Sequence, residues 1–432
     1  MFKHTDYSEN YGAVMQFNTN KHEPIHRWYP FVEGYSKEFI DSILEEVDLN
    51  RVQCSLDPFS GSGTTPLVLQ NKKMKCYSFE VSPFMHELSY AKLTTTYKSK
   101  SLLNDLDKLN ELLIATPEDI DNYITFPKSK YYVQSEEINR WHYNLPTMTG
   151  IADLIYAFSK IDNLNNQRLF RIALASILIP ISNMYRNGKC LSYKKNWKDI
   201  PVVDRQEVHQ LFTEKIQTIF VPDIIQLEKQ NNENLIVSNR EYCLKGSALN
   251  LITTLPDESI DLVITSPPYL NSRDYTDSYI DELRVLGYFT NLKAERAFRA
   301  TTLKSHVQVS WEDLELISVP TFKRIYHSIE IHEAEFWNKN ILKMINGYFS
   351  DLKILLDNLF LKMKPGGQVF LNIGNSAYFG IVIPVDEIIA ELAELSGFAI
   401  SEIRIARNMK SSGQQKNSVT HLVESVIVMQ KK

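Results

Sequence analysis

Four consecutive residues, Ser266-Pro267-Pro268-Tyr269, combine groups that could bind an amino group carried on a flat ring. They follow the apolar run 260–265, which has the length and composition of a buried strand. Proline lacks an N–H donor and fixes φ, so the strand stops pairing here and the backbone beyond it is held rigid. The serine hydroxyl and a proline-restrained carbonyl supply two acceptors, and the tyrosine ring supplies a stacking surface. Open α/β sheets bind ligands at this end of their strands.

A second candidate site lies upstream, where the strand-like run 52–57 leads into a glycine turn and a helix start. Gly61 and Gly63 permit positive φ and let a ligand approach the backbone closely. A phosphate-binding P-loop requires Gly-Lys-Ser/Thr, and Thr64 stands where that lysine would be. The loop alone therefore indicates a small-molecule site of unspecified type.

An acidic residue, Glu80, ends the next strand candidate, 75–80. Dinucleotide-type folds place an acid about 20 residues after the glycine loop, where it accepts hydrogen bonds from ribose hydroxyls. An isolated glutamate at a strand end is more often a solvated side chain. Behind this loop, the position favours the ligand-binding interpretation.

Together, these strings resemble the motifs of DNA amino-methyltransferases. The first tetrapeptide is similar to their catalytic motif, residues 57–65 (Asp-Pro-Phe-Ser-Gly-Ser-Gly-Thr-Thr) resemble their S-adenosylmethionine loop, and residues 26–31 are similar to a segment packed beside that cofactor. The resemblance implies catalytic roles for Ser266, Pro267, Pro268 and Tyr269. It implies cofactor contacts from Trp28, Asp57, Phe59, Ser60, Gly61, Gly63, Thr64, Glu80, Ser247 and Ala248.

The family resemblance also bears on which amine is methylated. Adenine-N6 members usually begin the tetrapeptide with Asp or Asn and cytosine-N4 members with Ser, so Ser266 favours cytosine N4. One departure is Ser247, which stands where relatives often have an aspartate that contacts the cofactor's adenine amine. The implied reaction is direct methyl transfer without a covalent enzyme intermediate. Asn372 and Asn375, on either side of Gly374, are interpreted as turn residues.

Alternating strand and helix patterns predict an α/β fold with a doubly wound, mostly parallel sheet. The helix patterns 385–396 and 352–363 are the clearest, because each has an apolar face and a glycine beyond its end. The last two strands lack a helical connection and are predicted to form an antiparallel hairpin at the sheet edge. The resemblance implies a seven-stranded Rossmann-like class I methyltransferase sheet with one reversed strand. The strand candidates are 52–57, 75–80, 240–246, 260–265, 368–373, 398–406 and 423–430.

Two long stretches exceed what a crossover connection requires. We predict a catalytic domain over 1–96 and 238–432, interrupted by a mainly helical insertion at 97–237 that is a candidate target-recognition region. Residues 270–340 form a possible second insertion that contacts DNA.

Composition and net charge further limit the classes of function that are possible. The 432 residues are 44% hydrophobic and 23% charged, which is typical of soluble globular proteins, and the net charge of −5 gives no overall basic field. Basic and aromatic residues without acids nevertheless gather at 183–198. Candidate DNA contacts are Arg186, Lys189, Lys194, Lys195, Arg273 and Tyr275. Four scattered cysteines and no cationic apolar leader predict a reduced cytoplasmic protein without a metal site.

The function predicted from the sequence is site-specific methylation of double-stranded DNA at the N4 amine of a flipped cytosine, in a restriction–modification system with a possible cognate endonuclease. Adenine-N6 methylation of DNA is the nearest alternative, and methylation of RNA or of a protein amide is a further one. From another class, the chain could be a non-catalytic DNA-binding protein on a methyltransferase scaffold. Cofactor binding would separate this last alternative from the others.

Overall fold

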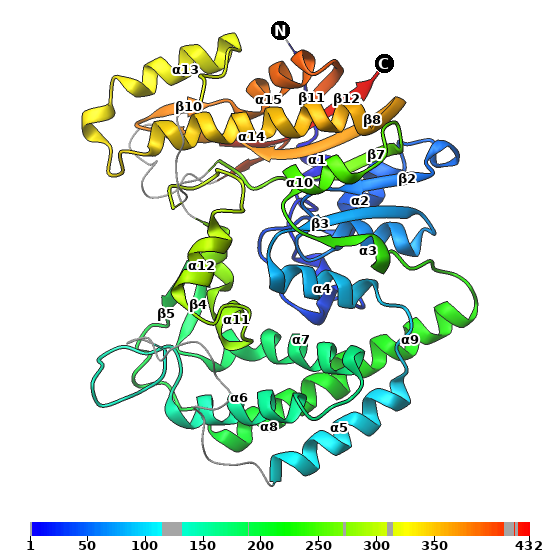
Figure 1. Ribbon diagram of the computed structural model, residues 1–432, viewed down its shortest axis with the longest axis vertical. Coiled ribbons are helices and arrows are strands. Elements are labelled where there is room, and N and C mark those ends of the chain that lie inside the picture. Colours follow the sequence, from blue (N-terminus) through cyan, green and yellow to red (C-terminus); the bar gives the residue numbers. More distant parts are fainter. Residues whose placement is uncertain are drawn as a thin grey trace.

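The computed structural model describes residues 2–114, 132–188, 190–270, 274–308, 314–409, 419 and 422–432. Its centre is an eight-stranded sheet in the order β1-β11-β12-β8-β7-β2-β3-β6 (Figure 1). These strands are β1 (His4–Asp6), β2 (Cys54–Asp57), β3 (Lys75–Glu80), β6 (Cys243–Lys245), β7 (Ile260–Thr265), β8 (Met363–Gly374), β11 (Phe398–Met409) and β12 (Leu422–Lys431).

The doubly wound, mostly parallel sheet predicted from the sequence is confirmed, but its strand number is not. β12 runs antiparallel to both β8 and β11, and the other neighbouring pairs in this sheet are parallel. The eighth strand, β1, pairs with β11 through His4↔Ile403 and so takes the edge that was assigned to the hairpin. Three residues without an alternating apolar pattern gave no sequence signal for this strand.

Helices cover both faces of the sheet. On one face lie α14 (Ile341–Lys362) and α15 (Val385–Leu395), whose buried leucines and isoleucines pack on β7, β8 and β11. On the other face, α2 (Lys37–Leu44) and α3 (Thr64–Asn71) pack on β7, β8 and β12. Both helix predictions at 352–363 and 385–396 fall on helices, although α14 begins eleven residues earlier.

The chain between β3 and β6 is mainly helical. It forms α4 (Pro83–Leu93), α5 (Ser99–Ile114), α6 (Leu145–Phe158), α7 (Leu164–Ile181), the hairpin β4 (Met184–Asn187) and β5 (Cys190–Tyr193), α8 (Arg205–Lys215) and α9 (Val221–Asn232). Figure 1 shows α5 to α9 as a layer on one side of the sheet domain, with α4 between this layer and the sheet. None of the helices in the described residues is long and apolar enough to cross a membrane.

The second long stretch follows β7 and connects the helical layer to the sheet domain. Its helices are α11 (Ile280–Val285), α12 (Leu292–Arg299) and α13 (Pro320–Glu330). The short α10 (Ala248–Leu251) precedes β7, α1 (Ser8–Tyr11) follows β1, and the small hairpin β9 (Ser376–Tyr378) and β10 (Ile381–Ile383) follows β8.

Candidate active site

The two candidate sites meet because their strands are neighbours in the sheet. β2 pairs with β7 in parallel, through Ser55↔Leu262 and Leu56↔Val263, so the segments that follow both strands leave the sheet side by side. From β2 the chain proceeds to β3 on one side, and from β7 to β8 on the other. This reversal of winding direction creates a crevice at the strand ends, the usual ligand site of such sheets.

A single cavity of about 1380 Å³ lies at this crevice. Ligand pockets commonly measure roughly 300–1,000 Å³, so the cavity has room for two small ligands together. The predicted site residues that line it are Phe59, Ser60, Gly61, Thr64, Glu80, Ser247, Ala248, Ser266, Pro267, Pro268, Tyr269 and Tyr275.

Glu80 shapes the glycine loop from the end of the neighbouring strand. Its carboxylate accepts hydrogen bonds from Gly61 N at 2.8 Å and from Ser82 N at 2.7 Å. Burial raises the pKa of Glu80 to about 7, and the two backbone donors oppose that rise. Since Glu80 also lines the cavity, it can hold the loop and face a ligand at the same time.

Asp57 and Gly63 stabilise the loop from behind and do not line the cavity. Asp57 accepts hydrogen bonds from Thr265 Oγ1 at 2.7 Å and from Phe59 N at 3.1 Å, which ties the ends of β2 and β7 together. Burial raises the pKa of Asp57 to about 6. Gly63 has φ +81°, and a Cβ there would lie 2.5 Å from Ser89 Oγ on α4. A glycine is required at this position because a side chain would clash with α4. Gly63 does not line the cavity, so the predicted direct contact with a ligand is corrected.

Two residues that the sequence analysis missed supply groups facing the cavity. Ser62 Oγ is buried and has no hydrogen-bond partner among the described residues, which suits a ligand with a donor or acceptor at this point. Phe31 packs against Gly61, where a Cβ would come within 3.1 Å of its ring, and stacks on Tyr279 with ring centroids 5.7 Å apart. Phe31, the last residue of the segment 26–31, thus gives the cavity an apolar wall.

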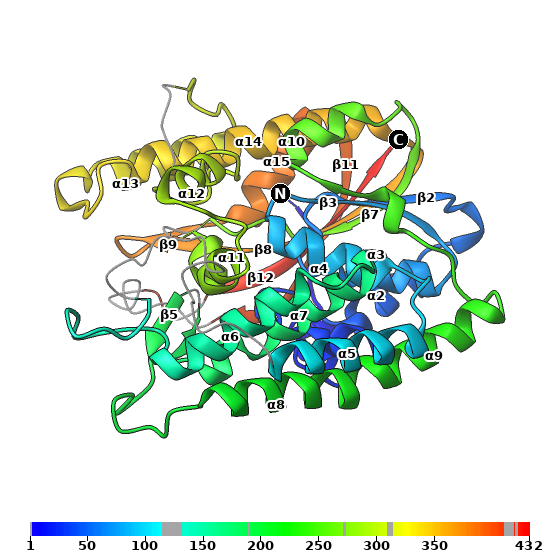
Figure 2. The ribbon, with the colours of Figure 1, turned by 60° about the horizontal axis from the view of Figure 1, so that its bottom comes forward.

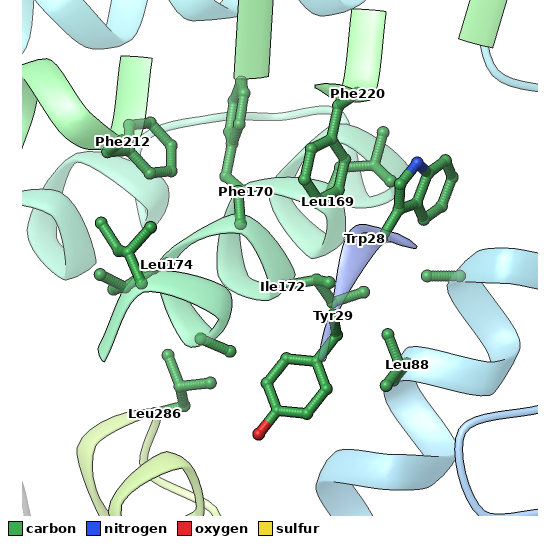
Figure 3. Close-up of a cluster of buried hydrophobic side chains, with 14 of the residues drawn as sticks. Trp28, Tyr29, Leu88, Leu169, Phe170, Ile172, Leu174, Phe212, Phe220 and Leu286 are labelled. Carbon is green, nitrogen blue, oxygen red and sulfur yellow. The ribbon is translucent and has the colours of Figure 1, made fainter. Parts of the chain in front are cut away.

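Trp28 does not line the cavity, contrary to its predicted role as a cofactor contact. Its indole is fully buried in the core shared with the helical layer, where it stacks on Phe220 with ring centroids 5.0 Å apart (Figure 3). The indole Nε1 donates a 3.0 Å hydrogen bond to Asp223 on α9. The side chain therefore anchors the N-terminal segment to the insertion.

The tetrapeptide is held by contacts from two strands and a helix. Tyr348 Oη on α14 donates a 2.9 Å hydrogen bond to the carbonyl of Pro268. Tyr269 Oη donates to the carboxylate of Glu424 on β12, and Asn372 Nδ2 on β8 donates to Tyr269 Oη at 2.8 Å and to Ser266 Oγ at 3.4 Å. Burial and the nearby carboxylate raise the pKa of Tyr269 well above its ordinary value, so the phenol stays protonated.

Asn372 and Glu424 were not assigned to the site from the sequence. Asn372 is buried within β8 and is not a turn residue, whereas Asn375 accepts a hydrogen bond from Asp386 N at 3.1 Å. Glu424 is buried at the start of the reversed strand, where Arg407 Nε donates to it. A charged residue within the mainly apolar run 422–429 is the signal that could have identified Glu424.

Of the residues predicted to contact DNA, Arg186 and Lys194 are occupied within the protein. Arg186 pairs with the buried Glu282 and donates to Tyr29 Oη at 2.6 Å. Lys194 Nζ donates to the carbonyls of Pro180 and Ser182 at 2.8 and 2.6 Å, which caps the end of α7. Both predictions are corrected on these grounds. Lys195 is exposed, while Lys189 and Arg273 lie outside the described residues.

Comparisons with known proteins agree with the motifs. Residues 260–432 match the family model of N6 and N4 DNA methylases. The chain is 26% identical to the Type II methyltransferase M.BsoBI of Geobacillus stearothermophilus, covering 93% of this chain and 84% of that protein. It is 24% identical to the Type II methyltransferase M.AvaI of Nostoc sp., over 93% of this chain and 85% of the relative.

One solved structure is a Thermus thermophilus protein provisionally described as a DNA modification methylase, in complex with S-adenosyl-L-methionine. It is 18% identical, and the match covers 43% of this chain and 53% of that chain with a TM-score of 0.22. Residues 260–432 thus match the DNA methylase family, and over nearly its whole length the chain is similar to Type II methyltransferases.

Proposed function

We propose that this protein transfers the methyl group of S-adenosyl-L-methionine to the exocyclic N4 amine of a cytosine in double-stranded DNA. The observation that carries the proposal is the adjacency of the glycine loop after β2 and the Ser266–Tyr269 tetrapeptide after β7 at one cavity. This arrangement supports placing a methyl donor and an amine acceptor next to each other, which is the main requirement of a direct transfer.

The cavity wall formed by the glycine loop fits the cofactor. Glu80 is positioned to accept hydrogen bonds from ribose hydroxyls, Ser62 Oγ is an unsatisfied buried group, and Phe31 supplies an apolar surface. Ser247, at the start of α10, would accept a hydrogen bond from the adenine amine in place of the usual aspartate. When bound, S-adenosyl-L-methionine supplies an electrophilic methyl group on a sulfonium.

The tetrapeptide orients the amine that is to be methylated. An amine on a nucleobase is a weak nucleophile, because its lone pair is delocalised into the ring. Ser266 Oγ and the Pro267 carbonyl would accept hydrogen bonds from its two N–H groups, which favours a tetrahedral nitrogen with its lone pair directed out of the base plane.

Tyr269 would provide the stacking surface for the base. A base within a duplex cannot reach this cavity, so the nucleotide must be rotated out of the stack. The tyrosine ring is fixed by the bonds of its hydroxyl to Glu424 and Asn372. A ring that is already immobilised loses little conformational entropy when a base stacks on it.

Cytosine is preferred over adenine because Ser266 begins the tetrapeptide. Adenine N6 is the second candidate, and the match to a family model that includes both N6 and N4 enzymes keeps it open. A non-catalytic DNA-binding role is the alternative of another class. The intact loop and the intact tetrapeptide at one cavity favour an enzyme.

We also propose that the protein acts in a restriction–modification system. The two full-length relatives are named as Type II methyltransferases, and a cognate endonuclease would be the partner. Since the proposed substrate is the DNA of the host cell, the corresponding location is the cytoplasm.

The proposal is tested with the purified protein, unmodified genomic DNA and S-adenosyl-L-methionine that carries a deuterated methyl group. Mass spectrometry of the digested nucleosides should detect deuterated N4-methylcytosine, and Ser401→Ala, at an exposed position in β11, serves as the serine control for Ser266→Ala. Loss of one hydrogen bond that aids the transfer predicts a decrease of about tenfold in turnover for Ser266→Ala. Label on adenine would refute the choice of cytosine, and no label in DNA would refute the proposed activity.

A further inference from the structure

The β4–β5 hairpin, which we call the ribbon (described residues 184–188 and 190–193), extends from the helical layer toward the catalytic cavity. Its register pairs Met184 with Tyr193 and Asn187 with Cys190. Figures 1 and 2 both place the ribbon next to α11, on the side of the molecule opposite α9. The end of the ribbon lines the cavity through Asn187, Gly188 and Cys190. The insertion therefore supplies part of the wall that surrounds the catalytic residues.

One face of the ribbon is anchored to the segment that follows the catalytic tetrapeptide. Arg186 forms an ion pair with Glu282 on α11 and donates a 3.1 Å hydrogen bond to the carbonyl of Ser278. Its guanidinium also lies 5.2 Å from the centroid of the Tyr279 ring. These contacts fix the position of the ribbon relative to the residues downstream of Tyr269.

The other face of the ribbon carries hydrogen-bonding side chains and reaches the wall of the cavity at its end. Paired residues of an antiparallel hairpin project on the same side, so Tyr185, Ser192, Asn187 and Cys190 share this face, and the last two line the cavity. Tyr185 is 43% exposed and Asn187 is exposed. A hydroxyl–hydroxyl–amide set of this kind matches the donors and acceptors on base edges.

The surroundings of the ribbon are basic and aromatic. No acidic residue occurs between Asn183 and Lys198, and the exposed Arg140 lies over Tyr193 at 5.8 Å. Lys198 is exposed and lies 5.5 Å from the centroid of the Trp197 ring. These exposed cations stand beside the polar strand pair, at one aromatic cluster next to the end of β5, and suit contacts with DNA phosphates.

The second hairpin at the cavity, β9–β10, has a different chemistry. Its tip residue Phe379 stacks on Phe336 and on His332, and β10 is apolar throughout. Glu335, which also lines the cavity, stands beside this hairpin. An apolar and acidic surface suits phosphates and base edges less well than the surroundings of the ribbon.

From these observations we propose that the ribbon is the element that reads the DNA sequence, inserted into the major groove beside the flipped target base. A two-stranded ribbon fits a groove about 12 Å wide and about 8.5 Å deep. Asn187 and Tyr185 contact base edges, and Lys195 and Lys198 contact phosphates. The inference deepens the proposed function, because it names the part of the protein that selects the methylated site.

The test is selection of a random 30-bp duplex library by the full chain carrying Ser266→Ala, followed by sequencing of the bound duplexes. That background should enrich a defined motif, and adding Asn187→Ala or Tyr185→Ala should broaden it at one or two positions. The affinity for the motif should fall about tenfold while the affinity for an unrelated duplex is unchanged. Asn232→Ala, at an exposed position at the end of α9, is the matched control and should leave the motif and both affinities unchanged.

Phosphate contact is tested separately with Lys195→Ala. Affinity for every duplex should fall by the same factor, and the slope of log affinity against log salt should decrease by about 1. The control is Lys229→Ala on α9, which should change neither quantity. Thermal unfolding of each variant excludes a loss caused by misfolding.

The outcomes separate this inference from the proposed function. A motif that is identical in wild-type and ribbon-variant selections, or the absence of any motif, overturns the ribbon inference whether or not methylation occurs. A motif that depends on the ribbon supports the inference. If such a motif is found but no methyl group is transferred to DNA, only the proposed function is overturned.

Discussion

Tyr269 Oη and Asn372 Nδ2 lie 2.8 Å apart, and both side chains also donate to the carboxylate of Glu424. The tyrosine follows β7, the asparagine lies in β8 and the glutamate opens the reversed strand β12. Because β12 is antiparallel, its first residues lie beside the last residues of β7 and β8, at the carboxyl ends of the parallel strands. The reversed strand thus places a buried acid beneath the tetrapeptide.

This relationship predicts a positioning role for Asn372. Asn372→Ala should lower turnover by about tenfold, because Tyr269 and Ser266 each lose a donor that fixes their orientation. The dissociation constant of S-adenosyl-L-methionine, measured by calorimetry, should change less than threefold, since the asparagine lies beneath the tetrapeptide and not beside the loop. An equal loss of cofactor affinity and turnover would contradict this role.

The raised pKa of Glu80 predicts a specific pH dependence of stability. Its pKa rises from 4.5 to about 7 on folding, so between these values the folded state binds more protons than the unfolded state. The contribution of Glu80 to the free energy of unfolding must therefore fall as pH rises from about 4.5 to about 7, by up to roughly 3 kcal/mol.

The measurement is urea unfolding of the wild type and of Glu80→Gln at pH 5 and at pH 7.5, without cofactor. Other groups titrate in both proteins, so the difference between the two proteins isolates Glu80. The wild type should lose more stability than the variant over this interval. A smaller loss in the wild type would show that the pKa of Glu80 is not raised.

Gly63 is predicted to matter for stability through α4. Gly63→Ala places a Cβ 2.5 Å from Ser89 Oγ, whereas Gly366→Ala, at nearly the same φ of +82°, meets no atom within 4 Å. Both variants lose about 1–2 kcal/mol of stability from the left-handed backbone. Gly63→Ala should lose about 1–3 kcal/mol more because of the clash. Equal unfolding free energies for the two variants would contradict the packing explanation.

Arg186 is predicted to stabilise the junction between the insertion and α11. Arg186→Ala leaves the buried Glu282 carboxylate without its ionic partner, and breaking a buried pair in this way costs about 3–5 kcal/mol. Arg186→Ala/Glu282→Leu should recover most of this loss, because the double variant no longer buries an unpaired charge. If Arg186→Ala unfolds at the same urea concentration as the wild type, the side chain is not required at this junction.

The sequence predicted the winding of the sheet and the meeting of the two motifs, because both depend on local patterns. An apolar run followed by Pro267 or by Gly61 marks a strand end without any knowledge of distant contacts. Because neighbouring strands are parallel, their carboxyl ends then lie on the same side of the sheet. β1 escaped prediction because three residues carry no periodic signal and their pairing with β11 spans almost the whole chain.

Local sequence patterns could not predict which side chains contact one another in the folded protein. Trp28 and Phe31 are three residues apart, yet one stacks on Phe220 of the insertion and the other faces the cavity. The partners of Arg186 on α11 are nearly 100 residues away in the chain. Whether a basic side chain is available to DNA depends on such distant acids, so a run of basic residues alone overstated the exposed charge.

The most direct test of the central claim is mass spectrometry of nucleosides from the genomic DNA of a host that expresses this chain, compared with a host that expresses Ser266→Ala. N4-methylcytosine should appear with the wild type and be lost or strongly reduced with the variant. N6-methyladenine in its place would contradict the assignment of the base, and genomic DNA without either modified base would contradict the assignment as a DNA methyltransferase.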